Sequence, residues 1–348
     1  MQEKHDIVRI GLVGAGANTR RRHIPSFQSQ PNVEIVCVAN RSRESSGRIA
    51  QEYNIPEIKD SWQDVVSSPD IDAVCIGTWP YLHREITCAA LEEGKHVLCE
   101  ARMAMDLSEA RTMLEASRNK SHLVTQLVPT PLGLAVHRTV RRILDEGGLG
   151  EWLAVEVREL WDDLTEPGTP LKWRQRKELS GHNYVTLGQW FELLVRWLGS
   201  VEWIDACAKI HVDSQHDPKT GSPYSVEMPD HLAVVAQFKN GAAGHLLCSA
   251  VVGTEPESVL RLHGSKGTLR YSPHSESLHW FDRASDVAQE VAVEPGGGWR
   301  VEEEFISAIR GQEQVEFTDF VTGVRYMELS ESVYRSWSEA KRIQLPLP

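Results

Sequence analysis

The sequence has 348 residues, of which 41% are hydrophobic and 25% charged, and its formal net charge at pH 7 is −12. This length exceeds one ordinary hydrophobic core, so we expect a soluble globular protein of two domains. The negative charge argues against nucleic acid as a partner, because a phosphate backbone binds basic surfaces. No apolar run approaches the roughly 20 residues that span a membrane.

The N-terminal segment MQEKHD is charged and leads directly into a strand pattern. No signal peptide is therefore visible, and we expect a cytoplasmic protein. The six cysteines form no CxxC pair, which predicts free and mostly buried thiols. No cluster of His, Asp and Glu has the spacing of metal ligands, so we predict no metal.

Strand and helix patterns alternate from residue 7 to about residue 125. The apolar, strand-like runs are 7–14, 34–40, 71–78, 96–100 and 123–128. The helical patterns are 44–53, 84–94 and 106–120. Asp106 or Ser108 is a candidate cap of the last helix. Continuous apolar strands separated by helices predict a parallel sheet that is covered on both faces.

The pattern changes after about residue 126. A long alternating strand, 151–160, precedes a helix, 186–199. Further strand-like runs follow at 203–212, 231–241, 242–252, 258–267 and 268–272. Turn signals such as Lys239-Asn240-Gly241 separate them, which predicts antiparallel pairs and an α+β second half. The chain ends on helical patterns at 302–311 and 320–342.

The segment VRIGLVGAG, residues 8–16, has the setting of a dinucleotide-binding turn. Gly14 and Gly16 follow a strand directly and open a helix, and Ala17 and Asn18 come next. Glycines let the backbone approach the pyrophosphate, which rests on the helix N-terminus. Thr19 stands where a third glycine is usual, so a plain strand-to-helix turn stays an alternative.

The second strand ends at Asn40-Arg41-Ser42, where NAD-binding proteins commonly carry an acidic residue for the ribose hydroxyl. A neutral residue followed by a guanidinium removes repulsion and offers a bidentate phosphate donor. The sequence therefore favours NADP(H) over NAD(H). The alternative is that these arginines are solvated charges at a helix end.

Four further segments together resemble one known family. They are residues 71–100, GGLGEWLAVEV at 147–157, LRLHGSKGTLRY at 260–271 and FISAIRGQEQVEF at 305–317. In order and spacing the chain resembles the Gfo/Idh/MocA oxidoreductases, which act mainly on sugars and polyols.

The resemblance implies two domains. The first, residues 1–125, is an NAD(P)-binding Rossmann domain, a doubly wound parallel sheet. The second, residues 126–348, is an α+β domain for substrate binding and oligomerisation with an open, mainly antiparallel sheet. Its C-terminal helix is expected to pack back on the first domain. A homodimer or homotetramer is also expected.

The family's usual catalytic side chains are missing. Its Glu-Lys-Pro signature is here Glu100-Ala101-Arg102, so the lysine that polarises the reacting hydroxyl is absent. Its Asp-x-Gly-x-His motif corresponds to residues 186–190, where Thr186 and Trp190 replace the aspartate and the acid/base histidine. By resemblance, Thr78, Trp79, His83 and Glu100 border the cofactor.

Three interpretations follow from these replacements. The first is an oxidoreductase with a relocated acid/base group. The second is a redox-assisted lyase or glycosidase that oxidises a sugar carbon, eliminates and then reduces again, with no net cofactor turnover. The third is a nucleotide-binding protein without chemistry.

Replacement groups stand in the segment SGHNYVTLG. Imidazole titrates near pH 6.5 and phenol near pH 10, so His182 is a better neutral-pH base than Tyr184. Tyr184 could donate to an oxyanion, and Arg102 could supply the missing positive charge. The alternatives are that His182 and Asn183 cap the helix, that Tyr184 is packed, and that Arg102 pairs with Glu100 or points into solvent.

A local basic patch precedes the same helix and could receive an anionic group of a sugar-like substrate. The candidate substrate-binding residues here are Lys172, Trp173, Arg174, Asn183 and Trp190. Tryptophan rings offer an apolar platform for a sugar face. A solvated loop and ordinary core packing are the alternatives.

Overall fold

The computed structural model describes residues 7–164, 169–253, 255–285 and 287–348, so the charged N-terminal hexapeptide lies outside the described residues. The chain forms two compact units. The first unit comprises the chain up to residue 129 together with residues 300–324, and the second comprises residues 130–299 and 325–348. The sequence placed the boundary between residues 125 and 126 and did not assign the returning segment 300–324 to the first domain.

The first unit is built on a six-stranded sheet in the order β3-β2-β1-β4-β5-β6. Every strand pair is parallel. The strands are β1 (Val8–Val13), β2 (Val33–Ala39), β3 (Glu57–Ile58), β4 (Ala73–Ile76), β5 (His96–Cys99) and β6 (Thr125–Leu127). Strand β4 is buried along its whole length, as expected of a parallel sheet covered on both faces. The predicted Rossmann-type fold is confirmed.

Helices connect these strands. They are η1 (Thr19–His23), α1 (Ile24–Ser29), α2 (Arg43–Tyr53), α3 (Trp62–Val66), η2 (Pro80–Leu82), α4 (His83–Glu92) and α5 (Leu107–Asn119). Asp106 caps α5, since its carboxylate accepts the Glu109 backbone N–H at 2.9 Å. Ser42 caps α2 in a reciprocal arrangement with Ser45.

The returning segment completes the first unit. It holds α9 (Val301–Ile309), which contacts α1, and the start of α10 (Phe320–Glu339). The backbones of Leu127 and Thr318 exchange hydrogen bonds of 2.8 and 3.1 Å, so the segment extends the hydrogen bonding beside β6.

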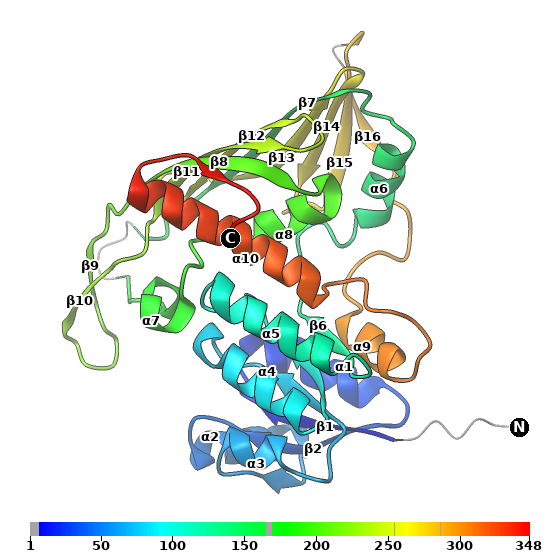
Figure 1. The fold of residues 1–348 in the computed structure, drawn as a ribbon, viewed down its shortest axis with the longest axis vertical. Coiled ribbons are helices and arrows are strands. Elements are labelled where there is room, and N and C mark those ends of the chain that lie inside the picture. The colour runs from blue at the N-terminus through cyan, green and yellow to red at the C-terminus, as the bar shows by residue number, and fades with distance from the viewer. Residues whose placement is uncertain (1–6, 165–168, 254, 286) are drawn as a thin grey trace, which may run out of the picture. The chain divides into compact units, whose positions relative to one another are not determined.

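The second unit contains a nine-stranded sheet in the order β16-β15-β14-β13-β7-β12-β11-β8-β17 (Figure 1). The strands are β7 (Trp152–Leu160), β8 (Val201–Lys209), β11 (His231–Phe238), β12 (Ala243–Ser249), β13 (Glu257–Gly264), β14 (Gly267–Ser272), β15 (Ser277–Asp282), β16 (Ala288–Val291) and β17 (Ile343–Gln344). The pairs are antiparallel except β7 with β12, which run parallel. A separate hairpin is formed by β9 (Ser214–His216) and β10 (Pro223–Ser225).

The helical elements of this unit are α6 (His137–Asp145), η3 (Trp173–Gln175), α7 (Lys177–Ser180), α8 (Leu187–Leu198) and the later part of α10. Helix α8 packs on the sheet, where Trp197 meets Tyr271 edge to face with ring centroids 5.8 Å apart. Strand β11 alternates buried and exposed side chains, and Val235 on its outer face is 42% exposed. One face of the sheet is thus packed within this chain, and the other is open.

Among the residues that the structure describes, no helix combines the length and the apolar character of a membrane span. All six cysteines are free thiols. Four are buried as expected, whereas Cys88 is half-buried and Cys207 is exposed. Cys207 differs from the expectation because it points from β8 in the outward series of an open sheet face.

The ends of β1 and β4 touch through glycines, which yields a stability prediction. A Cβ on Gly77 would collide with the Gly14 carbonyl oxygen and with Thr19 Oγ1. Gly77→Ala should therefore destabilise the protein by about 1–3 kcal/mol in urea unfolding. Gly47→Ala is the matched control. Gly47 lies in the interior of α2, and a Cβ there would be 3.9 Å from the nearest atom, in Ile58, so the substitution should stabilise the helix by about 1 kcal/mol. Equal stability of Gly77→Ala and the unmodified protein would contradict the close approach.

Candidate functional site

The glycine turn after β1 is held in a form that suits a pyrophosphate. Gly14 has φ of +82°, where a side chain would be strained, and its N–H donates to Ala39 O at 2.8 Å. The Ala15 N–H donates to Asn40 Oδ1 at 2.7 Å. A Cβ on Gly16 would make an ordinary van der Waals contact with the Gly77 carbonyl oxygen at 3.6 Å, so the surroundings of this glycine are not crowded. The turn thus leaves room for close approach of a ligand.

Thr19 and Thr78 stand on either side of this turn. Thr19 is 1% exposed, and its hydroxyl donates to Gly14 O at 3.4 Å, so it packs where a third glycine is usual. Thr78 Oγ1 is buried without a hydrogen-bond partner among the described residues. An unsatisfied hydroxyl beside the glycine turn is consistent with a polar ligand there. The residues of the turn therefore fit a dinucleotide.

The residues after β2 are arranged for different tasks. The Asn40 amide is used inside the protein, accepting from Ala15 and donating to Ser45 O at 3.3 Å. Arg43 pairs with Asp60 at the surface. Arg41 is exposed, and its guanidinium carbon lies 5.7 Å from the centre of the Trp79 ring. Of Arg41 and Arg43, only Arg41 forms no ion pair with a carboxylate of the described residues.

His83 is fully buried at the start of α4. Its Nδ1 lies 2.9 Å from Arg102 O and its Nε2 lies 3.1 Å from Thr78 O. Burial lowers the pKa of His83, so the ring is neutral and donates from only one nitrogen at a time. His83 ties the loops after β4 and β5 together, and any contribution to cofactor binding runs through those loops.

Glu100, directly after β5, belongs to a hydrogen-bonded group that the sequence analysis did not foresee. Its Oε1 lies 3.0 Å from His23 Nε2 and accepts from Asn18 Nδ2 at 2.5 Å. His23 Nδ1 in turn hydrogen-bonds to Glu302 on α9. Glu302 stands in a run of three glutamates, and the packing of α9 shows that Glu302 and Glu304 turn inward while Glu303 lies at the surface.

Arg102 is half-buried at the same corner. Its side chain makes no ion pair or hydrogen bond with the described residues, so the alternative pairing with Glu100 is not formed. The positive charge is available at the position next to Ala101. An always-ionised guanidinium there can bind an anionic or polar group but cannot act as an ordinary base.

In the second unit, His182 has a fixed orientation. Its Nδ1 lies 2.8 Å from Glu331 Oε2 on α10, and the Arg335 guanidinium donates to Glu331 Oε1 at 3.0 Å. The His182 ring stacks on Tyr334 with centroids 3.9 Å apart and planes at 17°. The hydrogen bond to His182 lowers the pKa of Glu331. Burial opposes this effect, but the pKa stays below its usual value. A carboxylate that accepts from Nδ1 leaves Nε2 as the nitrogen that can accept a proton.

The residues that follow His182 are more structural. Tyr184 is 2% exposed, and burial raises the pKa of its phenol, so this hydroxyl is a poor acid near neutral pH. Val185 has φ of +41°, an outlier for a β-branched residue, of the kind found at functional sites. Thr186 is the N-cap of α8 but makes no capping bond, and Asn183 instead donates to Ser180 O. The capping alternative for His182 and Asn183 is not what the structure shows.

Trp190, at the position of the family's histidine, is fully buried and leaves no ring face for a sugar. The Glu159 carboxylate on β7 lies beside it and accepts from Ser258 Oγ at 2.5 Å. Burial raises the pKa of Glu159, and Ser258 and Trp190 oppose that rise. The expectation of a tryptophan platform at this position therefore has no exposed surface to support it.

The basic patch ahead of α8 is largely neutralised. Lys172 pairs with Asp163, and Arg176 pairs with Asp217. Arg174 stacks over the Trp173 ring at 4.4 Å. Because Lys172 and Arg176 already pair with carboxylates, an anionic substrate would have to compete with Asp163 and Asp217 for them.

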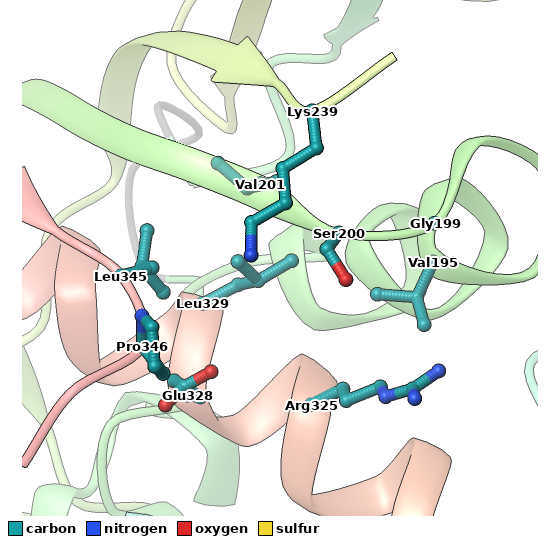
Figure 2. Close-up of a pocket in the computed structure, with 10 residues that line it drawn as sticks. All are labelled: Val195, Gly199, Ser200, Val201, Lys239, Arg325, Glu328, Leu329, Leu345 and Pro346. Atoms are coloured by element: carbon teal, nitrogen blue, oxygen red, sulfur yellow. The ribbon is translucent and has the colours of Figure 1, made fainter.

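A pocket of about 100 Å³ lies at the far end of α8 from His182. Figure 2 shows the Lys239 side chain extending into it. Its lining residues are Val195, Gly199, Ser200, Val201, Lys239, Arg325, Glu328, Leu329, Leu345 and Pro346. None of the residues predicted from sequence lines this pocket. Among the described residues, no group of three or more His, Cys, Asp or Glu side chains is placed to hold a metal ion.

The parallel sheet and the glycine turn define a dinucleotide-binding protein of the Rossmann type. Comparison with known families agrees: residues 8–127 match the oxidoreductase family with an NAD-binding Rossmann fold, and residues 137–270 match the GFO/IDH/MocA C-terminal domain. The chain belongs to the Gfo/Idh/MocA family of oxidoreductases.

Two curated relatives and one solved structure show the range of similarity. Levoglucosan dehydrogenase of Pseudarthrobacter phenanthrenivorans is 23% identical over 307 residues, covering 81% of this chain and 77% of the relative. The 1,5-anhydro-D-fructose reductase of Ensifer adhaerens is 36% identical over 149 residues, covering 43% of this chain and 44% of the relative. A structure of levoglucosan dehydrogenase with NADH and L-sorbose superposes with a TM-score of 0.85 at 20% identity, covering 97% and 99% of the two chains.

The environment of His23 predicts its protonation. Burial alone lowers its pKa, but the hydrogen bonds to Glu100 and Glu302 outweigh burial and raise the pKa to about 9. Because the pKa of His23 in the folded protein exceeds the ordinary histidine value of 6.5, the stabilisation is complete below pH 6.5 and is lost as pH rises towards 9. Nitrogen-15 NMR of labelled histidine should show the His23 ring protonated throughout pH 6–8. A His23 titration midpoint below 7 would contradict this.

Proposed function

We propose that the protein is an NADP(H)-preferring oxidoreductase that moves a hydride between the nicotinamide and a hydroxyl or carbonyl of a carbohydrate-like substrate. The observation that carries the proposal is the glycine turn of a family member, with Gly14 in the left-handed region and Asn40 holding Ala15. The names of the two curated relatives support a carbohydrate-type substrate. When bound, the nicotinamide supplies or accepts the hydride, and the protein supplies orientation and proton transfer.

The preference for NADP(H) rests on the residues after β2. Asn40 carries no charge and is occupied within the protein, so it does not repel a 2′-phosphate. Arg41 is exposed and unpaired by any described carboxylate, and its position beside Trp79 holds the guanidinium near the turn. A guanidinium binds phosphate through two parallel hydrogen bonds. The relative with NADH shows that the same fold also takes the unphosphorylated cofactor.

Arg41→Ala tests the cofactor preference. We expect a loss of about tenfold in NADP+ affinity by calorimetry, with NAD+ affinity unchanged, because only NADP+ carries the 2′-phosphate. Arg43→Ala is the matched control, since Arg43 already pairs with Asp60 and should contribute little. Equal affinity of the unmodified protein for both cofactors would refute the preference.

His182 is the proposed acid/base group. Glu331 holds its Nδ1, so Nε2 is free to take a proton from a substrate hydroxyl or return one to a carbonyl. Arg102 is proposed to supply positive charge in place of the missing lysine. Within the basic segment, Arg174 with Trp173 is the proposed contribution to substrate binding, together with Lys172 and Asn183.

Replacing His182 tests this role. His182→Ala should lower kcat by about 10²–10⁴-fold, the usual contribution of a general base. Glu331→Gln should lower kcat less, because an amide oxygen still accepts the Nδ1 proton. Tyr184→Phe separates the second candidate, since it removes only the buried hydroxyl and is expected to leave kcat nearly unchanged. Undiminished turnover of His182→Ala would remove His182 from the mechanism.

The redox-assisted lyase or glycosidase is a second candidate, because Ala101 and Trp190 stand in place of the family's polarising lysine and its acid/base histidine. Net formation of reduced cofactor with substrate in the steady state distinguishes the two. Turnover of a sugar without net cofactor change supports the second candidate. Cofactor affinity without turnover supports a purely binding protein.

Assembly and location are part of the proposal. The open face of the nine-stranded sheet supports a homodimer or homotetramer, because Val235 on its outer side is 42% exposed within the single chain. We also propose that the protein acts in the cytoplasm.

A further inference from the structure

His23 is enclosed between two acidic side chains in the first unit. Its side chain is 0% exposed, and those of Glu100 and Glu302 are 15% and 1% exposed. The Nε2 atom is 3.0 Å from Glu100 Oε1, and Nδ1 hydrogen-bonds to Glu302 Oε1. Three segments far apart in sequence, the helix after the glycine turn, the end of β5 and α9, thus meet at one ring.

The hydrogen bonds determine the charge of this group. An ionised carboxylate only accepts hydrogen bonds, so both ring nitrogens of His23 must carry protons for both contacts to form. The ring is then an imidazolium between two carboxylates, and the three side chains together carry one negative charge. Burial opposes ionisation of Glu100, but the bonds from His23 and Asn18 outweigh it, and the pKa of Glu100 is lowered.

The topology places this charge on the nicotinamide side. In the strand order β3-β2-β1-β4-β5-β6, each half of the sheet binds one nucleotide, and the order reverses between β1 and β4. The glycine turn and Arg41 belong to the adenosine half. Glu100 follows β5 directly, so it lies at the carboxyl end of the half that receives the nicotinamide nucleotide.

We propose that Glu302, His23 and Glu100 fix a negative charge beside the nicotinamide and thereby select the oxidised cofactor, whose ring is cationic, over the reduced cofactor, whose ring is neutral. This inference rests on the cofactor site of the proposed function and adds a discrimination that the site's shape alone does not provide. Oxidised and reduced cofactors share every other charge, so the electrostatic difference between them is confined to the ring. Glu302 is a positioning residue, because it acts through His23.

Other groups near Glu100 do not titrate around neutral pH. Burial lowers the pKa of His83 and raises the pKa values of the Cys75 and Cys99 thiols, so these three are neutral. Arg102 stays positive and partly offsets the charge of Glu100 at every pH. That offset is constant. Glu304, two residues from Glu302 on α9, has a pKa that burial raises to about 7, so the pH series is repeated in Glu304→Gln to separate its titration from that of Glu100, His23 and Glu302.

The test measures binding without substrate or turnover. Dissociation constants of NADP+ and NADPH are determined by calorimetry for the unmodified protein and for Glu100→Gln. We expect the ratio of the reduced to the oxidised dissociation constant to fall by about tenfold in Glu100→Gln. Glu303→Gln is the matched control, because Glu303 lies next to Glu302 but pairs with Arg300 at the surface and should leave the ratio unchanged.

The pH dependence provides a second measurement that needs no loss of the carboxylate. In the unmodified protein the ratio should stay constant from pH 6 to 8. In His23→Asn, whose fold is checked by circular dichroism, Glu100 loses its cation and picks up a proton more easily, so the ratio should be lower at pH 6 than at pH 8.

A ratio that Glu100→Gln leaves unchanged, while both cofactors still bind, would overturn the charge selection and leave the proposed function intact. A ratio that changes between pH 6 and 8 in both the unmodified protein and Glu304→Gln would also overturn it. Failure of the unmodified protein to bind either cofactor would instead overturn the cofactor site itself.

Discussion

The buried imidazolium of His23 is the interaction on which the candidate cofactor site depends. It connects the helix after the glycine turn with the end of β5 and with α9, a segment that arrives from the far end of the chain. Removing His23 would leave the two carboxylates of Glu100 and Glu302 buried without their cation, which costs far more than an exposed pair contributes. The same contacts that hold these segments together therefore also set the charge at the corner of the sheet.

A second constraint is the close approach of the loops after β1 and β4. The Gly14 and Gly77 backbones touch, Thr19 fills the space of a third glycine, and His83 hydrogen-bonds to the loops after β4 and β5. Thr19 and His83 thus serve to fix the backbone around the turn. The exposed Arg41 and the half-buried Arg102, in contrast, form no ion pair with the described residues.

In the second unit, the position of the family's acid/base histidine and the proposed proton-transfer group are separate. Trp190 fills the position of the usual histidine with a fully buried ring, and His182 stands before the helix with a carboxylate behind it. The positive φ of Val185 separates the His182 segment from the start of α8. The proton-transfer group and the core of the helix are therefore on neighbouring but distinct stretches of chain.

Local sequence signals were sufficient to predict the Rossmann-type sheet and the mainly antiparallel second sheet, because apolar periodicity and a glycine turn depend on neighbouring residues. The order and spacing of four segments indicated the family. Asp106 as a cap of α5 is likewise a local signal. Only the tertiary structure showed the parallel pairing of β7 with β12, the return of residues 300–324 to the first unit, and the roles of Glu302 and Glu331. Those contacts join residues from about 90 to 279 positions apart. Which face of a glutamate-bearing helix turns inward is decided by packing rather than by the residues beside it.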